Sequence, residues 1–149
     1  MAPHTTLRRR VLAAALAIPV ILGVAPALAA RATTAELGTR TVSSRICDFD
    51  WRESKREVKR LIRCAARHWE SPGGANKALD IARCESGYNT DAYNPAGYAG
   101  VFQHAVHYWP DRADKWGFPD RSVYNGRANI IVSIRMARSA GDWGLWGCA

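Results

Sequence analysis

Four cysteines constrain the fold of this chain more than any other feature: Cys47, Cys64, Cys84 and Cys148. They follow a segment with the pattern of a signal peptide, in which arginines at 8–10 precede an apolar run, 11–24, and small residues at 26–30. Export leads to an oxidising environment, so we expect two disulfides, for which three pairings are possible. Zinc is the alternative, but the chain has no Cys-x-x-Cys pair and its histidines are not spaced with the cysteines. We therefore expect no metal and no cofactor.

The signal-peptide pattern and the composition of the residues that follow it divide the chain into three segments. Residues 1–30 are expected to be a signal peptide, cleaved after export by the general or the twin-arginine route. An uncleaved anchor is the alternative, but the apolar run is short for the ~20 residues that span a bilayer. Residues 31–45 are polar and aperiodic, and we expect a flexible tether there. Residues 46–149 are expected to form one domain of a secreted protein that has no stable membrane insertion.

The balance of charge favours anionic partners. The net charge is +8, and the first 30 residues contain three arginines and no acidic residue, so the remainder carries +5. A basic exported protein is attracted to polyanions, which include the acidic polymers of a bacterial wall. Charge alone does not separate these polymers from nucleic acid.

Helical patterns dominate the expected domain. A capping box, Ser54 to Glu57, precedes apolar residues at helical spacing up to Trp69, with a basic outer side. After a break at 71–74, a second helix is expected from about Ala75 to Glu85. Asn125 is a candidate cap for a long apolar helix, 127–139, that we expect to be central and buried.

Less regular structure is expected between the second and the third of these helices. Residues 87–100 read as a loop with a possible short hairpin, because they are rich in Gly and Asn. Residues 101–109 are expected to form a short helix that Pro110 stops, followed by a further helical turn at 111–116. The expected fold class is therefore mainly α.

Glu85 is the residue on which a functional hypothesis can be built. It stands at the end of the second expected helix, at the edge of the buried face. Partial burial raises the pKa of a carboxyl group, and a protonated carboxyl beside a glycosidic oxygen can act as general acid. Side chains that suit sugars follow within about 25 residues, since aromatic faces stack on sugar rings and amides pair with hydroxyl and N-acetyl groups: Tyr88, Asn94, Tyr98, Gln103 and Tyr108. The alternative is a solvated carboxylate, or one paired with an arginine.

Four short motifs in order carry a resemblance to a known family: Glu85-Ser86, Asn94-Pro95, Gly100-Val101-Phe102-Gln103 and Asn129-Ile130. Together they resemble the Glu-Ser, Asn-Pro, Gly-Leu-Met/Phe-Gln and Asn-Ile motifs of the lytic transglycosylases, over residues 75–148. This chain departs from the family in having Val101 for Leu, in lacking the terminal Tyr-Asn-Ala-Gly motif, and in a Trp143/Trp146 end that looks more like wall hydrolases of the resuscitation-promoting-factor type.

The resemblance implies a small lysozyme-like α (α+β) domain that cleaves the β-1,4 bond between N-acetylmuramic acid (MurNAc) and N-acetylglucosamine (GlcNAc) in peptidoglycan. Glu85 would be the acid and then the base, without a cofactor, in a monomer at the cell wall. The side chains expected to bind glycan strands are Ser86, Asn94, Tyr98, Gln103, Tyr108 and Asn129. The resemblance also favours the pairing of Cys84 with Cys148, which leaves Cys47 with Cys64.

The reaction type depends on whether a second carboxylate assists Glu85. A hydrolase usually has one, either as nucleophile or to activate water, and Asp91 is the nearest acid that follows Glu85. A transglycosylase needs none, because its Glu deprotonates the sugar's own 6-hydroxyl group, and we favour this outcome. The alternatives are a hydrolytic muramidase with Asp91 as helper, a wall-binding module without turnover, and a basic protein that binds nucleic acid or membranes. His104 and His107 lack a third ligand for a metal and are expected at the surface or in the cleft wall.

Overall fold

The computed structural model describes residues 41–149. The expected signal peptide, and residues 31–40 of the expected tether, lie outside this range. The last residues of that tether are described and lie against the domain, since the backbone N–H of Val42 donates to Gly117 O at 3.0 Å. Arg127 Nη2 donates to the carbonyl oxygens of Ser43 and Ile46, each at 2.7 Å.

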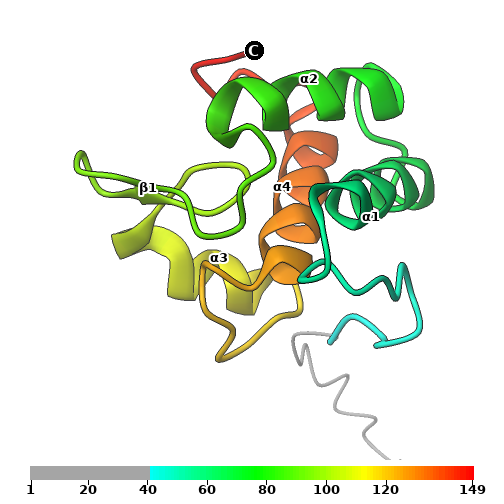
Figure 1. Ribbon diagram of the computed structural model, residues 1–149, viewed down its shortest axis with the longest axis horizontal. Helices are drawn as coiled ribbons and strands as arrows, with labels where there is room; N and C mark the ends of the chain where they lie inside the picture. The colour runs from blue at the N-terminus through cyan, green and yellow to red at the C-terminus, as the bar shows by residue number, and fades with distance from the viewer. Residues whose placement is uncertain (1–40) are drawn as a thin grey trace, which may run out of the picture. The chain divides into compact units, whose positions relative to one another are not determined.

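The long apolar helix lies at the centre of the domain, as expected. It is α4, Gly126–Ala140, and nine of its residues are buried. Asn125 caps it by accepting from Ala128 N at 3.0 Å, and Gly141 ends it with a left-handed backbone. Figure 1 shows α4 in orange, with α1 to its right, α2 across its upper end, and the small sheet and α3 to its left.

The two helices that precede the sheet also agree with the sequence patterns. Helix α1 is Lys55–His68, and the Ser54 hydroxyl caps it by accepting from Glu57 N. Helix α2 is Gly74–Ser86, and it packs against α1. Their apolar faces join the core that surrounds α4, so the end of α2, which carries Glu85, is held by packing along the helix.

The segment after α2 forms a three-stranded antiparallel sheet in the order β1-β2-β3. Its strands are β1 Tyr93–Asn94, β2 Tyr98–Ala99 and β3 His104–Ala105, with Tyr93 opposite Ala99 and Tyr98 opposite Ala105. The first two strands form the short hairpin that the Gly- and Asn-rich loop suggested.

The expectation of a helix over 101–109 is wrong. This segment forms turns, β3 and a 3₁₀ turn, η1 Val106–Tyr108, because Gly100 and Gln103 both have positive φ (78° and 47°), which an α-helix does not contain. Pro110 does not stop a helix but stands at the start of one, α3 Trp109–Lys115. A proline fits there because the first-turn N–H groups have no partner within the helix.

Both disulfides have the pairing that the family resemblance favoured. Cys47–Cys64 joins the segment before α1 to that helix. Cys84–Cys148 joins α2 to the carboxyl-terminal loop, 141–149, one residue before Glu85. The domain is therefore a small mixed structure of helices and a short sheet with two cross-links, and its disulfides indicate an oxidising environment such as the cell exterior. Among residues 41–149, none of the helices combines the length and apolar character that a bilayer span requires.

Candidate active-site cleft

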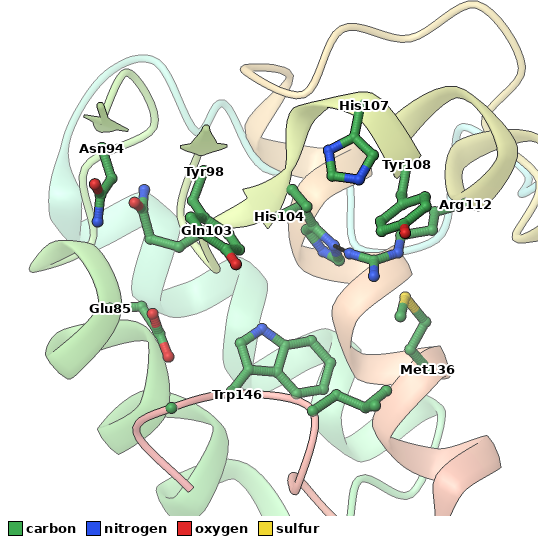
Figure 2. A pocket seen from close by; sticks show the side chains of 13 residues that line it. Glu85, Asn94, Tyr98, Gln103, His104, His107, Tyr108, Arg112, Met136 and Trp146 are labelled. Carbon is green, nitrogen blue, oxygen red and sulfur yellow. Dashed lines mark hydrogen bonds between the residues drawn. The ribbon is translucent and has the colours of Figure 1, made fainter. Parts of the chain in front are cut away.

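A cleft of about 480 Å³ lies between the end of α2, the sheet, α3 and the carboxyl-terminal loop. Figure 2 shows the side chains that surround it. The lining residues are Glu85, Asn94, Tyr98, Gln103, His104, Ala105, His107, Tyr108, Arg112, Met136, Leu145, Trp146 and Gly147. The cleft therefore brings together four of the residues expected to bind sugar, with Glu85 beside them.

Glu85 is half-buried at the edge of this cleft, and its carboxylate extends from α2 toward Trp146 (Figure 2). Desolvation by burial raises the pKa of this carboxyl group, and the backbone N–H of Cys148, which donates to Oε1 at 3.3 Å, offsets part of the rise. A raised pKa increases the protonated fraction at any given pH. Glu85 therefore has the setting that the sequence led us to expect for a general acid.

Glu85 is the sole carboxylate in the lining of the cleft within residues 41–149. Asp91, the expected helper, is exposed in the loop before β1 and is not among the lining residues. The lining of the cleft in this part of the chain therefore gives no support to hydrolysis with Asp91 as helper.

The sheet and the turns next to it supply a polar wall opposite α2. Gln103 Nε2 donates to Gly100 O at 2.9 Å, which fixes the amide and leaves its oxygen as an acceptor. Asn94 Oδ1 accepts from Ala96 N at 2.9 Å, which leaves its NH₂ group as a donor. Tyr98 and Tyr108 present exposed aromatic rings at the cleft, 43% and 54% accessible. This wall could stack on sugar rings and hydrogen-bond to their amide substituents.

A chain of buried hydrogen bonds supports the other side of the cleft. Arg112 Nη1 donates to His104 Nδ1 at 3.2 Å, so the ring proton is on Nε2, which donates to Ser133 Oγ at 2.7 Å. Ser133 Oγ in turn donates to Asn129 O at 2.7 Å. Burial, together with the charge of Arg112, lowers the pKa of His104 to about 3, so the imidazole is neutral at physiological pH. His104 is therefore a fixed part of the cleft wall.

Two residues expected to bind substrate have structural roles instead. Asn129 is fully buried and all its amide atoms are used: Oδ1 accepts from Phe102 N at 2.9 Å and Nδ2 donates to Val123 O at 3.0 Å. It lies so close to Gly100 that a Cβ there would be 2.3 Å from Nδ2. Ser86 Oγ donates to Val101 O at 2.7 Å and does not line the cleft. Both side chains hold the Gly100–Gln103 segment against the helices, and neither offers a free atom to a sugar.

Sequence reasoning missed three residues that line the cleft in Figure 2: Arg112 and Met136 at its right-hand side and Trp146 at its lower edge. Trp146 Nε1 donates to Phe102 O at 2.9 Å, and the same side chain also lines the cleft. Trp109 is buried, donates from Nε1 to Arg121 O and is not among the residues that line the cleft. No local pattern marks Arg112, since it enters the cleft only through the turn that precedes α3.

No family model, curated protein or solved structure matches this chain.

Proposed function

We propose that this protein is a secreted, wall-associated enzyme of lysozyme-like fold that cleaves the MurNAc–GlcNAc β-1,4 bond of peptidoglycan without water, using Glu85 alone. The observation that carries the proposal is the setting of Glu85: a half-buried carboxyl of raised pKa, in a cleft that is also lined by aromatic, amide, basic and aliphatic side chains. The order of the motifs that resemble those of the lytic transglycosylases supports it further.

The reaction follows from one carboxyl group acting twice. Protonated Glu85 gives its proton to the bridging oxygen, and the bond to the anomeric carbon of MurNAc breaks. The resulting carboxylate then takes the proton of that sugar's 6-hydroxyl group, whose oxygen closes onto the anomeric carbon. The product is a 1,6-anhydro sugar, and Glu85 is protonated again. The absence of a second acid from the cleft lining of residues 41–149 favours this route over hydrolysis.

Substitution of Glu85 separates catalysis from simple wall binding. Purified mature protein should clear peptidoglycan embedded in a gel, and the Glu85→Gln variant should not, because an amide cannot donate the proton. Glu53→Gln is the matched control, since Glu53 is exposed and outside the cleft, and it should clear at the normal rate. Circular dichroism should confirm that all three proteins are folded.

Each other outcome has a distinct meaning. Clearing that persists in Glu85→Gln contradicts the proposed mechanism. A protein that sediments with peptidoglycan but never clears it is instead a wall-binding module. A protein that does not bind glycan, but binds polyanions with an affinity that falls steeply as salt is added, would have a nucleic-acid or membrane ligand.

A further inference from the structure

Arg112 is a charged residue of the cleft to which the proposed reaction assigns no role. It projects from α3 and lies across the cleft from Glu85, beside Tyr108 (Figure 2). Its side chain is half-buried, with the guanidinium carbon 5.5 Å from the centre of the Tyr108 ring.

The charge of Arg112 has no acidic partner among residues 41–149. The ion pairs of that range are Arg60–Glu57, Arg83–Asp80 and Arg138–Glu70. The neighbour that Arg112 does contact, His104, is neutral. Partial burial of a cation that has no counter-ion destabilises the free protein. An unpaired cation in such a position is typical of a site where a bound ligand supplies the negative charge.

The donors of Arg112 are also largely unused. A guanidinium has five N–H groups, and within the described chain one of its nitrogens, Nη1, hydrogen-bonds to His104. The imidazole that accepts this bond is held by Ser133 on α4. The guanidinium is therefore oriented by the buried network while its remaining donors are available at the cleft.

We propose that Arg112 binds a carboxylate group carried by the glycan strand, at the side of the cleft opposite Glu85. This inference rests on the proposed function, because it assigns part of the same substrate. An arginine fork pairs with a carboxylate through two parallel hydrogen bonds. In peptidoglycan such a group comes either from the lactyl ether of a MurNAc without its peptide or from the attached peptide. A neutral GlcNAc oligomer has neither, so Arg112 would distinguish wall glycan from such oligomers.

Binding to a non-cleaving protein tests this directly. In the Glu85→Gln background, calorimetry would measure three ligands of equal sugar length: a GlcNAc oligomer, a GlcNAc–MurNAc oligomer with free lactyl carboxylates, and the same oligomer with its peptides. Adding Arg112→Gln should lower the affinity for at least one carboxylate-bearing ligand by about tenfold, while the affinity for the GlcNAc oligomer should change by less than about twofold. The ligand that loses affinity identifies the source of the carboxylate.

Two further variants control for charge and for folding. Arg138→Gln removes the same charge from an exposed site on α4 outside the cleft and should leave all three affinities unchanged. Arg112→Lys keeps the charge without the fork, and it should retain the preference for carboxylate ligands at reduced strength. It provides the comparison if Arg112→Gln does not fold, as judged by thermal unfolding.

The outcomes separate this inference from the proposed function. If Arg112→Gln lowers the affinity for all three ligands equally, the role of Arg112 is purely structural and the inference is overturned. The inference is also overturned if the substitution lowers none of the three affinities, or if the protein binds none of the three ligands. If Glu85-dependent clearing is observed while Arg112→Gln binds carboxylate ligands normally, the inference fails alone. If Arg112 selects carboxylates but the protein never cleaves, the catalytic proposal fails alone.

Discussion

The disulfide beside Glu85 should matter for activity as well as stability. Replacing both of its cysteines, Cys84→Ser with Cys148→Ser, opens a link between residues 64 apart, for which the loop-entropy model gives a loss of about 4 kcal/mol in unfolding free energy. The other pair, Cys47→Ser with Cys64→Ser, is the matched control. It opens a link across 17 residues and should cost about 3 kcal/mol. The two variants therefore differ little in stability.

Their activities should differ much more. Without its cross-link the carboxyl-terminal loop can move away from α2, so Glu85 loses the N–H of Cys148 and the cleft loses its Trp146 wall. The loop is not released entirely, because Trp146 Nε1 still donates to Phe102 O and Trp143 Nε1 to Pro72 O. Misplacement of a catalytic group by about 1 Å can cost up to about a hundredfold in rate, so we expect a loss of about tenfold to a hundredfold per folded molecule.

Two measurements decide this prediction. Urea unfolding followed by tryptophan fluorescence gives the folded fraction of each variant, and the rate of peptidoglycan clearing is then expressed per folded molecule. The variant without Cys47–Cys64 should retain the normal rate. Equal rates for the two variants, or a normal rate without Cys84–Cys148, would refute the idea that the loop positions Glu85.

Three further predictions concern the residues that shape the cleft. Asn129→Ala leaves a buried N–H and a buried carbonyl without partners and should cost about 3 kcal/mol in urea unfolding, whereas Asn125→Ala removes a helix cap and should cost about 1 kcal/mol; similar costs would contradict the anchoring role. The pKa of His104 falls from 6.5 to about 3 on folding, so the unfolded chain takes up the proton first and stability is lost as the pH falls through this window. His104→Gln should flatten that acid limb, and the exposed His107→Gln should not. The pKa of Glu85 is raised above 4.5, so its contribution to stability is present below that pH and is lost as the pH rises through the folded-state pKa. The Glu85→Gln protein should therefore gain stability relative to the wild type between acid and neutral pH, and a relative loss would show that the carboxylate is not desolvated.

The helices were predictable because their signals are local. The capping residues Ser54 and Asn125 and the apolar spacing that follows each define α1 and α4 within a residue or two. The segment 101–109 was not predictable in the same way. Its apolar residues suit a helix, but the positive φ of Gln103, and the bond from Phe102 N to Asn129 on a distant helix, impose a strand and turns instead.

The candidate site was predictable only where residues of suitable chemistry lie close together in the sequence. Glu85 and the polar residues of the hairpin lie within 20 residues of one another, so a local pattern could select them. Asn129 fitted the family motif but is an internal anchor, since a motif records a residue type and not the direction in which its side chain points. Arg112 and Trp146 reach the cleft through tertiary packing, and no spacing in the sequence places them beside Glu85.

Mass analysis of digested peptidoglycan tests the central mechanism most directly. Cleavage by Glu85 acting alone predicts MurNAc ends that are 1,6-anhydro sugars, lighter by one water than the reducing ends that hydrolysis leaves. These products should appear with the wild type and with Glu53→Gln and be absent with Glu85→Gln. Reducing ends as the main product, or anhydro ends that persist without Glu85, would contradict a single carboxyl group acting as acid and then as base.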